Sequence, residues 1–377
     1  MNFDRIAQFQ KELYDIGIAG SDVAVYVDGK PVFRNFFGYQ DMERNIPISD
    51  KTVYRMFSMT KPITCAAAML LYEEGRFLMN DPVSDYMPCF DMKNMQVKQQ
   101  DGSLKCAEKP MEVQHLFEMT AGFDYNLKRP SLLKLYEETK DNFTTMQFVE
   151  ALAKEPLNFE SGTRWDYSLC HDVLAGLIES ISGMTYNDFA QKRIFDPLGM
   201  KEAWFHIPEG ELSRVCHRYG MHDGKYRNAD EPNQYQRSPR HESGGAGVSM
   251  TIDDYAKFAC MMTNRGLGLN GERILAGRTV DIMRRNRLDG QRMIDYNNGN
   301  RFDREDYGYG LGVRVNMNRG CNNYSALGEF GWAGAWGTYV LMDPENKVTI
   351  VYGEAAEDTM ANYIRRRLRN MVYASLE

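Results

Sequence analysis

The sequence lacks most features that mark special classes of protein. No window of 18 residues is continuously apolar, so no membrane-spanning segment is expected. The first twenty residues mix charged and apolar side chains and lack the apolar core of a signal peptide. Lysine and arginine form no cluster, and the net charge of −7 argues against nucleic acid as a partner. These absences predict a cytoplasmic protein.

Cofactor and metal signatures are also missing. The seven cysteines are odd in number and include no C-x-x-C pair, which favours free thiols in a reducing compartment. The histidines show neither H-E-x-x-H nor another metal-ligand spacing. The literal G-x-G-x-x-G at 266–271 follows a predicted helix, so it fails the context of a dinucleotide-binding fingerprint and indicates a helix end and loop. We predict neither a metal nor a cofactor.

What is present is an ordinary globular composition with mixed structural signals. The 377 residues allow two or three lobes, and 43% of them are hydrophobic and 26% charged. Apolar residues recur at helical spacing over 1–16. Strand-like segments occur near both chain ends, at 21–27, 32–37, 309–315, 337–342 and 348–352. Helical signals dominate the middle of the chain, at 113–119, 132–139, 145–153, 170–182 and 186–194, and return from Thr251 and near Thr359.

This order predicts an α+β fold. An antiparallel sheet flanked by helices would be built from residues 1–80 and 245–377. A mostly helical lobe of residues 81–244 would be inserted between them.

The chemistry is expected at the run FSMTKP, residues 57–62, where a strong helix signal starts near Ser58 and ends at Gly75. Residues three apart share a helix face, so Lys61 can reach the Ser58 hydroxyl. A serine needs a neighbouring base, and a lysine can serve where burial or nearby positive charge favours the neutral amine. The first N–H groups of the helix lack internal partners and can stabilise an oxyanion.

The S-x-x-K pattern is short, and SLLK at 131–134 is a second match, which we interpret as a solvated helix start after Pro130. Two further motifs favour the first match. WDYSL at 165–169 places Tyr167 before a helix, where a phenol can shuttle protons; a core tyrosine is the alternative. GEFGWAGAWGT at 328–338 spaces four glycines before a strand, so the backbone can approach a ligand closely; an ordinary turn is the alternative.

In this order the three motifs resemble the serine β-lactamase and penicillin-binding superfamily. Within it they are most similar to the class C branch and its relatives, the family VIII carboxylesterases. Three flanking runs agree with family patterns, namely LFEMTAG at 116–122, FDPLGM at 195–200 and GGAGVSMTIDDY at 244–255. The likeness covers nearly the whole chain and implies a β-lactamase/transpeptidase-like fold.

The resemblance also implies roles for individual residues. Ser58 would be the nucleophile, Lys61 its activating partner and Tyr167 the proton shuttle. The backbone N–H groups of Ser58 and Ala335 would form the oxyanion hole. Substrate-binding positions would be Trp332, Ala333 and Gly334, in place of the K-T-G or H-T-G triplet, and Leu169.

Two of these positions depart from the β-lactamase pattern. Leu169 stands where β-lactamases carry the Asn of Y-x-N, and Trp332 stands where they carry Lys. Both changes remove polar partners of an anionic β-lactam and favour an uncharged ester. W-x-Y-S-L and a Trp-containing triplet are similar to the esterase branch, from which Ala333 is a small departure.

We therefore predict a serine hydrolase, a carboxylesterase that cleaves small acyl esters through an acyl-enzyme on Ser58. Its partner would be a small-molecule ester or amide, and the oligomeric state is left open. A β-lactamase, a D-amino-acid peptidase or an acyltransferase could use the same site. A non-catalytic penicillin-binding-like protein is the alternative from another class. His171-Asp172 could suggest a Ser-His-Asp triad, but the chain has no G-x-S-x-G elbow.

Overall fold

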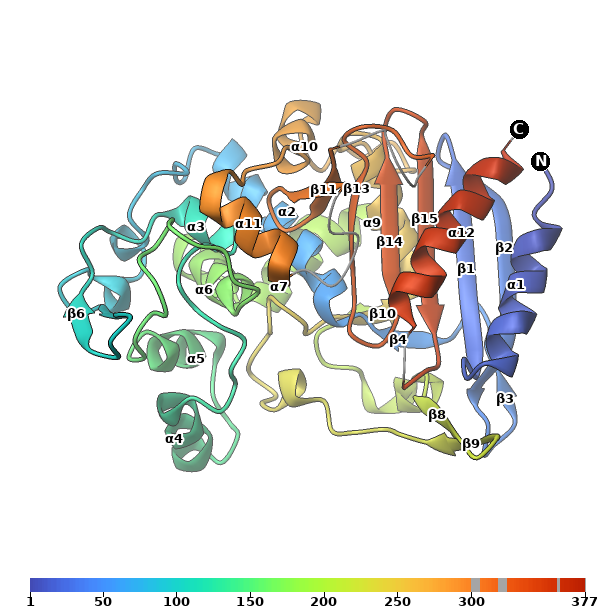
Figure 1. Ribbon diagram of the computed structural model, residues 1–377, viewed down its shortest axis with the longest axis horizontal. Coiled ribbons are helices and arrows are strands. Elements are labelled where there is room, and N and C mark those ends of the chain that lie inside the picture. Colours follow the sequence, from blue (N-terminus) through green and yellow to red (C-terminus); the bar gives the residue numbers. More distant parts are fainter. Residues whose placement is uncertain (300–305, 318–323, 358–359, 377) are drawn as a thin grey trace.

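The computed structural model describes residues 1–299, 306–317, 324–357 and 360–376. Its main sheet has eight antiparallel strands in the order β11-β12-β13-β14-β15-β1-β2-β3. The strands are β1 (Gly20–Val27), β2 (Lys30–Asp41), β3 (Ile46–Pro47), β11 (Tyr307–Tyr309), β12 (Arg314–Asn316), β13 (Phe330–Ala333), β14 (Tyr339–Asp343) and β15 (Val348–Glu354). Because β1 pairs with β15, both ends of the chain build one sheet (Figure 1).

Helices cover both faces of this sheet. Strand side chains alternate between the faces, so Val23 and Val25 of β1 join a core layer with α1 (Asp4–Asp15) and α12 (Ala361–Ser375). Ala24 points the other way, into the larger core that also contains α9 (Ile252–Thr263). In Figure 1 both terminal helices lie over the strands at the same side of the molecule.

The middle of the chain is largely helical. Its helices are α3 (Val113–Phe117), α4 (Pro130–Thr139), α5 (Thr145–Leu152), α6 (Cys170–Ser182), α7 (Tyr186–Ala190) and α8 (Asp196–Leu198). They pack around α2 (Thr60–Glu73), whose first twelve residues are all buried. Small side chains at 66–68 allow α2 and α6 to approach closely.

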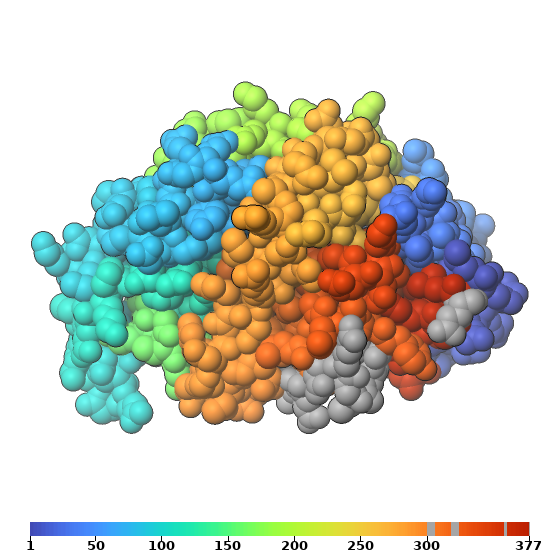
Figure 2. All heavy atoms as spheres, turned by 90° about the horizontal axis from the view of Figure 1, so that it is seen from above, coloured from blue at the N-terminus to red at the C-terminus, as the bar shows by residue number. Residues whose placement is uncertain are grey.

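Shorter pieces complete the fold. A three-stranded sheet joins β4 (Val53–Arg55), β10 (Ser249–Thr251) and β7 (Ala203–Trp204). Two hairpins pair β5 (Gln96–Lys98) with β6 (Leu104–Cys106) and β8 (Tyr219–His222) with β9 (Lys225–Asn228). The segment with α10 (Gly277–Met283) and α11 (Gly290–Gly299) is orange in Figure 2, where it separates the blue and cyan helical part from the red C-terminal strands.

The predicted α+β architecture, an antiparallel sheet flanked by helices, is confirmed; the lobe boundaries at residues 80 and 245 stay a prediction. The single strand predicted at 309–315 is wrong. The chain folds back between β11 and β12, where Gly312 has a φ of +74° and the Gly310 N–H donates to Val313 O at 2.8 Å. The helix predicted from near Thr359, which lies outside the described residues, starts at Ala361.

Three absences hold for the described residues alone. No helix there is both long and apolar enough to cross a membrane. No three His, Cys, Asp or Glu side chains in those ranges gather as metal ligands would. The described cysteines are free, and Cys321 lies outside the described residues.

Candidate active site

Ser58 lies where β4 turns into α2. Residues Phe57–Met59 form a 3-10 turn that leads into the helix at Thr60, which confirms that a helical segment begins close to Ser58. Phe57 has a φ of +44°, in the left-handed region that non-glycine residues rarely adopt. Its ring is held by Trp336, with centroids 4.6 Å apart, and by Tyr235 at 5.9 Å. This packing maintains the strained backbone immediately before the serine, which is only partly buried.

Lys61 lies one turn further along and is fully buried. Its Nζ is 3.1 Å from Ser58 Oγ and 2.7 Å from the carbonyl oxygen of Gly245. The third oxygen near Nζ is the hydroxyl of Tyr125, at 3.1 Å. The amine is therefore fixed beside the serine by partners on two other segments.

Tyr167 approaches the serine from the loop before α6. Its hydroxyl donates to Ser58 Oγ at 2.5 Å. Its ring stacks on Tyr125 at 5.2 Å and on Trp332 at 6.0 Å, and Lys61 Nζ lies 4.7 Å from its centroid. The structure thus brings together the three side chains predicted to be catalytic, while their roles stay a prediction.

The predicted oxyanion donor Ala335 lies in the turn between β13 and β14. The Gly334 N–H donates to Thr338 O at 2.8 Å to close this turn, and Thr338 Oγ1 donates to Met56 O at 3.1 Å. That second bond fastens the turn to the segment before Ser58. Ala335 is exposed, and among the described residues its N–H donates to no protein acceptor. The Ala335 N–H is therefore available on a turn fastened next to the serine segment, and its part in an oxyanion hole stays a prediction.

The predicted substrate-binding residues differ in accessibility. Trp332 and Gly334 are buried with little exposed surface, and Ala333 is partly buried. Leu169 is 1% exposed, belongs to the main core and donates its N–H to Asp124 O at 3.1 Å. Its contact with substrate stays a prediction, and it would require neighbouring side chains to move.

An aromatic wall adjoins Tyr167. It consists of Met119, Trp165, Leu288, Tyr296, Tyr309 and Trp332. Ring centroids within the wall lie 5.0–5.8 Å apart for neighbouring pairs, which is close packing. α11 contributes Tyr296, and the Arg164–Asp295 pair at 2.6 Å holds α11 against the loop that carries Tyr167. All six residues are buried, and Trp332, which is 8% exposed, stacks on Tyr167.

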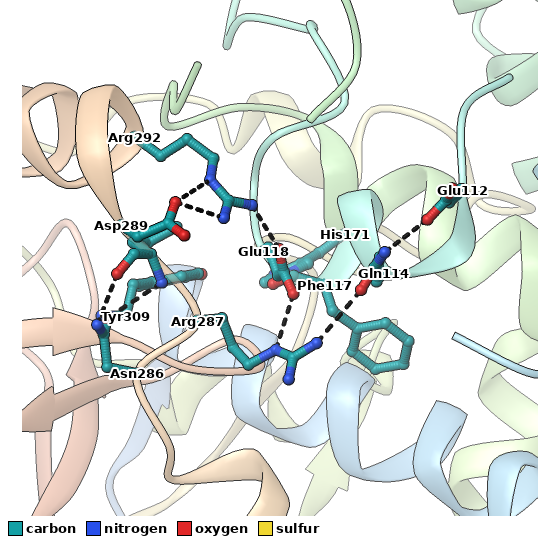
Figure 3. Close-up of polar contacts among 11 residues, drawn as sticks. Glu112, Gln114, Phe117, Glu118, His171, Asn286, Arg287, Asp289, Arg292 and Tyr309 are labelled. Atoms are coloured by element: carbon teal, nitrogen blue, oxygen red, sulfur yellow. Dashed lines mark hydrogen bonds and ion pairs between the residues drawn. The ribbon is translucent and has the colours of Figure 1, made fainter. Parts of the chain in front are cut away.

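A charged cluster surrounds Glu118, the residue before Met119 (Figure 3). Glu118 is 2% exposed and accepts hydrogen bonds from Arg287 Nε at 2.9 Å and Arg292 Nη1 at 3.5 Å. Burial raises the pKa of Glu118, and the two arginines oppose that shift. Arg287 also donates to Gln114 Oε1 at 3.2 Å. The cluster joins the end of α3 to the segment that leads into α11.

Two alternative catalytic groupings are not assembled. His171 Nε2 lies 3.3 Å from Phe117 O and 3.5 Å from Cys65 Sγ, and burial lowers the pKa of His171 to about 3. In the second S-x-x-K match, Lys134 pairs with the exposed Glu138 at 3.7 Å. Both groups have ordinary structural surroundings.

Sequence reasoning identified neither Tyr125 nor the hydrogen bonds that Asp172 makes in the interior of the fold. Tyr125 follows the TAG run at 120–122, and no motif in the sequence marks it as a partner of Lys61. Burial and the neighbouring Tyr167 hydroxyl raise the pKa of Tyr125 well above its usual value. Asp172 Oδ1 accepts from Ser243 Oγ at 2.5 Å and from the Gly245 N–H at 3.3 Å.

Comparisons with known proteins cover nearly the whole chain. Residues 4–367 match the family described as Beta-lactamase. Protein Rv1367c of Mycobacterium tuberculosis is 27% identical over 361 residues, which are 93% of this chain and 90% of that protein. Esterase EstB of Burkholderia gladioli is 27% identical over 270 residues, 66% of each chain. A putative D-alanyl-D-alanine carboxypeptidase of Escherichia coli is 24% identical, over 93% of this chain and 82% of that one.

Solved structures are similar over their full length. EstCE1, described as a hydrolase with promiscuous acyltransferase activity, superimposes with a TM-score of 0.80 at 23% identity and covers 98% of both chains. Simvastatin synthase (LovD) from Aspergillus terreus has a TM-score of 0.82 at 19% identity, with 100% of this chain and 99% of that one covered. The predicted β-lactamase/transpeptidase-like fold is confirmed.

Proposed function

The chain belongs to the β-lactamase family of serine hydrolases, and we propose that it is a carboxylesterase that cleaves small acyl esters through an acyl-enzyme on Ser58. One observation carries the proposal: Ser58 Oγ lies 3.1 Å from a buried amine and 2.5 Å from a phenol. A nucleophile within hydrogen-bond reach of an amine and a phenol, two groups that can exchange protons with it, is an arrangement suited to acyl transfer.

Acylation uses the three side chains together. As Ser58 Oγ attacks the ester carbonyl, its proton passes to Lys61, and the carbonyl oxygen becomes an oxyanion. The N–H groups of Ser58 and Ala335 stabilise that oxyanion. Tyr167 donates its proton to the leaving alcohol as the ester C–O bond breaks, and Lys61 returns a proton to Tyr167.

Deacylation reverses the proton path. Water attacks the acyl carbonyl and gives a proton to Tyr167, which passes its own phenol proton to Lys61. The bond between the carbonyl carbon and Ser58 Oγ then breaks, the carboxylic acid leaves and the serine regains its proton.

The surroundings of the site favour an uncharged ester as substrate. Trp332 replaces the cation that would meet a β-lactam carboxylate, and Leu169 replaces an amide. Trp332, which stacks on Tyr167 and is 8% exposed, presents an apolar ring at the site, so it suits a small acyl chain better than a charged group. EstB, a relative named as an esterase, adds support.

Turnover of p-nitrophenyl acetate and butyrate by the wild type, Ser58→Ala and Ser131→Ala tests the proposal. We expect Ser58→Ala to lose activity by about 10³-fold or more. Ser131→Ala, in the second S-x-x-K match, should keep the wild-type rate. Equal rates in wild type and Ser58→Ala would contradict the esterase assignment. Nitrocefin assayed in parallel tests the alternative, since faster lactam than ester hydrolysis would favour a β-lactamase.

A further inference from the structure

Three oxygen atoms surround Lys61 Nζ, and a neutral amine cannot form the same kind of hydrogen bond with all three. A neutral amine offers two N–H groups and one lone pair. The Gly245 carbonyl, 2.7 Å away, can only accept, so it always takes one N–H. The other N–H and the lone pair are left for the hydroxyls of Ser58 and Tyr125, both at 3.1 Å. Lys61 can act as a base toward Ser58 only when Tyr125 accepts the N–H and leaves the lone pair to the serine.

An acceptor for the Tyr125 proton lies nearby. Asp172 is buried, and its Oδ2 has no hydrogen-bond partner among the described residues, while Oδ1 binds Ser243 and the Gly245 N–H. A Cβ added to Gly245 would lie 2.6 Å from Asp172 Oδ2 and 2.9 Å from the Tyr125 hydroxyl. Both oxygens therefore border the space that this glycine leaves open. The inference requires the phenol to rotate, or one water to bridge the two oxygens, so that its proton is aimed at the carboxylate.

We propose that Tyr125 and Asp172 are positioning residues that keep the lone pair of Lys61 directed at Ser58. This inference rests on the proposed function. Asp172 accepts the phenol proton, so Tyr125 must accept from Lys61, and the remaining lone pair faces the serine hydroxyl. The logic matches that of the buried aspartate in a Ser-His-Asp triad, which orients the base without taking its proton.

The phenol is held independently of its hydroxyl. Its ring stacks on Tyr167 with an interplanar angle of 14° and meets the edge of Tyr235 at 6.0 Å. The preceding Asp124 pairs with Arg129 at 2.7 Å, which fixes the loop. Tyr125→Phe should therefore remove one oxygen and leave the ring where it is.

Kinetics of Tyr125→Phe, Asp172→Asn and the double variant test the inference with p-nitrophenyl butyrate. In Asp172→Asn the amide can donate to the phenol oxygen, which turns the phenol proton toward Lys61. We expect kcat to fall about 10- to 100-fold with KM nearly unchanged, because in this proposal the carboxylate acts through Lys61. Tyr125→Phe removes both the acceptor that orients the lone pair and the hydroxyl that can compete for it, so kcat should fall by about 3- to 5-fold, less than in Asp172→Asn. The double variant should match Tyr125→Phe, so that the second substitution restores most of the rate lost in Asp172→Asn.

A merely structural role gives the opposite result, since two packing defects should add and make the double variant slower than either single one. That outcome overturns the inference. Asp172→Ala offers a second route should Asp172→Asn not fold: without the carboxylate the phenol proton is free to turn toward Lys61, and Tyr125→Phe should again restore most of the lost rate.

The rate at which a fluorophosphonate labels Ser58 gives a readout that needs no ester. It should follow the same order, with wild type and both Tyr125→Phe variants fast and Asp172→Asn slow. A wild type that neither hydrolyses esters nor is labelled would overturn the proposed function. An active wild type whose double variant is the slowest would overturn this inference alone.

Discussion

The geometry around Ser58 depends on Gly334, a residue that has no side chain. A Cβ on Gly334 would lie 2.0 Å from Thr338 Oγ1 and 2.4 Å from Met56 O, far inside van der Waals contact. Those two atoms form the bond that fastens the Ala335 turn to the segment before Ser58. Glycine is therefore required here for close approach of two backbone segments.

Gly334→Ala should displace this turn and move the Ala335 N–H out of line with the oxyanion. We expect kcat for p-nitrophenyl butyrate to fall by about 100-fold, the usual cost of one lost oxyanion donor, with a much smaller change in KM. Gly210→Ala is the matched control, because a Cβ there meets no atom within 4 Å. Equal kcat in the two variants would contradict the role of the Ala335 turn.

At this scale the sequence motifs identified Ser58, Lys61 and Tyr167 as a set, and the structure brings them together. They did not identify Tyr125 or Asp172. The contacts of these two residues depend on a tertiary approach of distant segments, since Lys61 and Gly245 are 184 residues apart in the chain. No local spacing encodes such a contact.

Elements with strong helical periodicity were the most predictable. The helix predicted at 170–182 is α6, Cys170–Ser182. Strands were harder to predict where glycine interrupts the alternation of apolar and polar side chains. The glycine-rich run at 328–338 was predicted to precede a strand, yet Phe330–Ala333 within it is itself β13. A glycine has no side chain to mark which face it occupies, so alternation cannot be seen.

Glu179 gives α6 a pH-dependent stability. Burial raises the pKa of Glu179 to about 7, with the Tyr186 N–H at 2.9 Å opposing the shift. The folded state then holds a proton that the unfolded state has released, so stability falls as pH rises from about 4.5 to 7. In urea unfolding, Glu179→Gln should be more stable than wild type by about 1–2 kcal/mol at pH 8, after allowance for solvent screening, and equal to it at pH 5.

Glu138→Gln on α4 is the control, because that carboxyl is exposed and pairs only with the exposed Lys134. It should change stability equally little at both pH values. A Glu179→Gln variant whose advantage is the same at pH 5 and pH 8 would contradict the titration.

On the scale of the whole molecule, the site is assembled from segments that only the complete fold brings together. Ser58 and Lys61 come from the first part of the chain, Tyr125 and Tyr167 from the helical middle, and Ala335 from the C-terminal sheet. The alternation of strand, helix and strand signals was sufficient to predict that both chain ends share one sheet. The same signals could not predict how the helical middle is held against that sheet. Those connections include ion pairs, and the positions of charged side chains in the sequence show no periodicity that would reveal them.

Glu118 is one such connection, between α3 and the segment 287–292. Glu118→Ala leaves Arg287 and Arg292 facing a buried site without their carboxylate, so the free energy of unfolding should fall by about 2 kcal/mol or more. Glu74→Ala is the control: it breaks the Glu74–Arg193 pair, whose side chains are 39% and 34% exposed, and should cost less than about 1 kcal/mol. Urea unfolding measures both. Equal losses would show that Glu118 behaves as a surface charge. A larger loss for Glu118→Ala than for Glu74→Ala would show that the buried carboxylate stabilises the fold. If Glu118→Ala also raises KM relative to the wild type, and more for butyrate than for acetate esters, the same contact also supports the aromatic wall through the adjacent Met119.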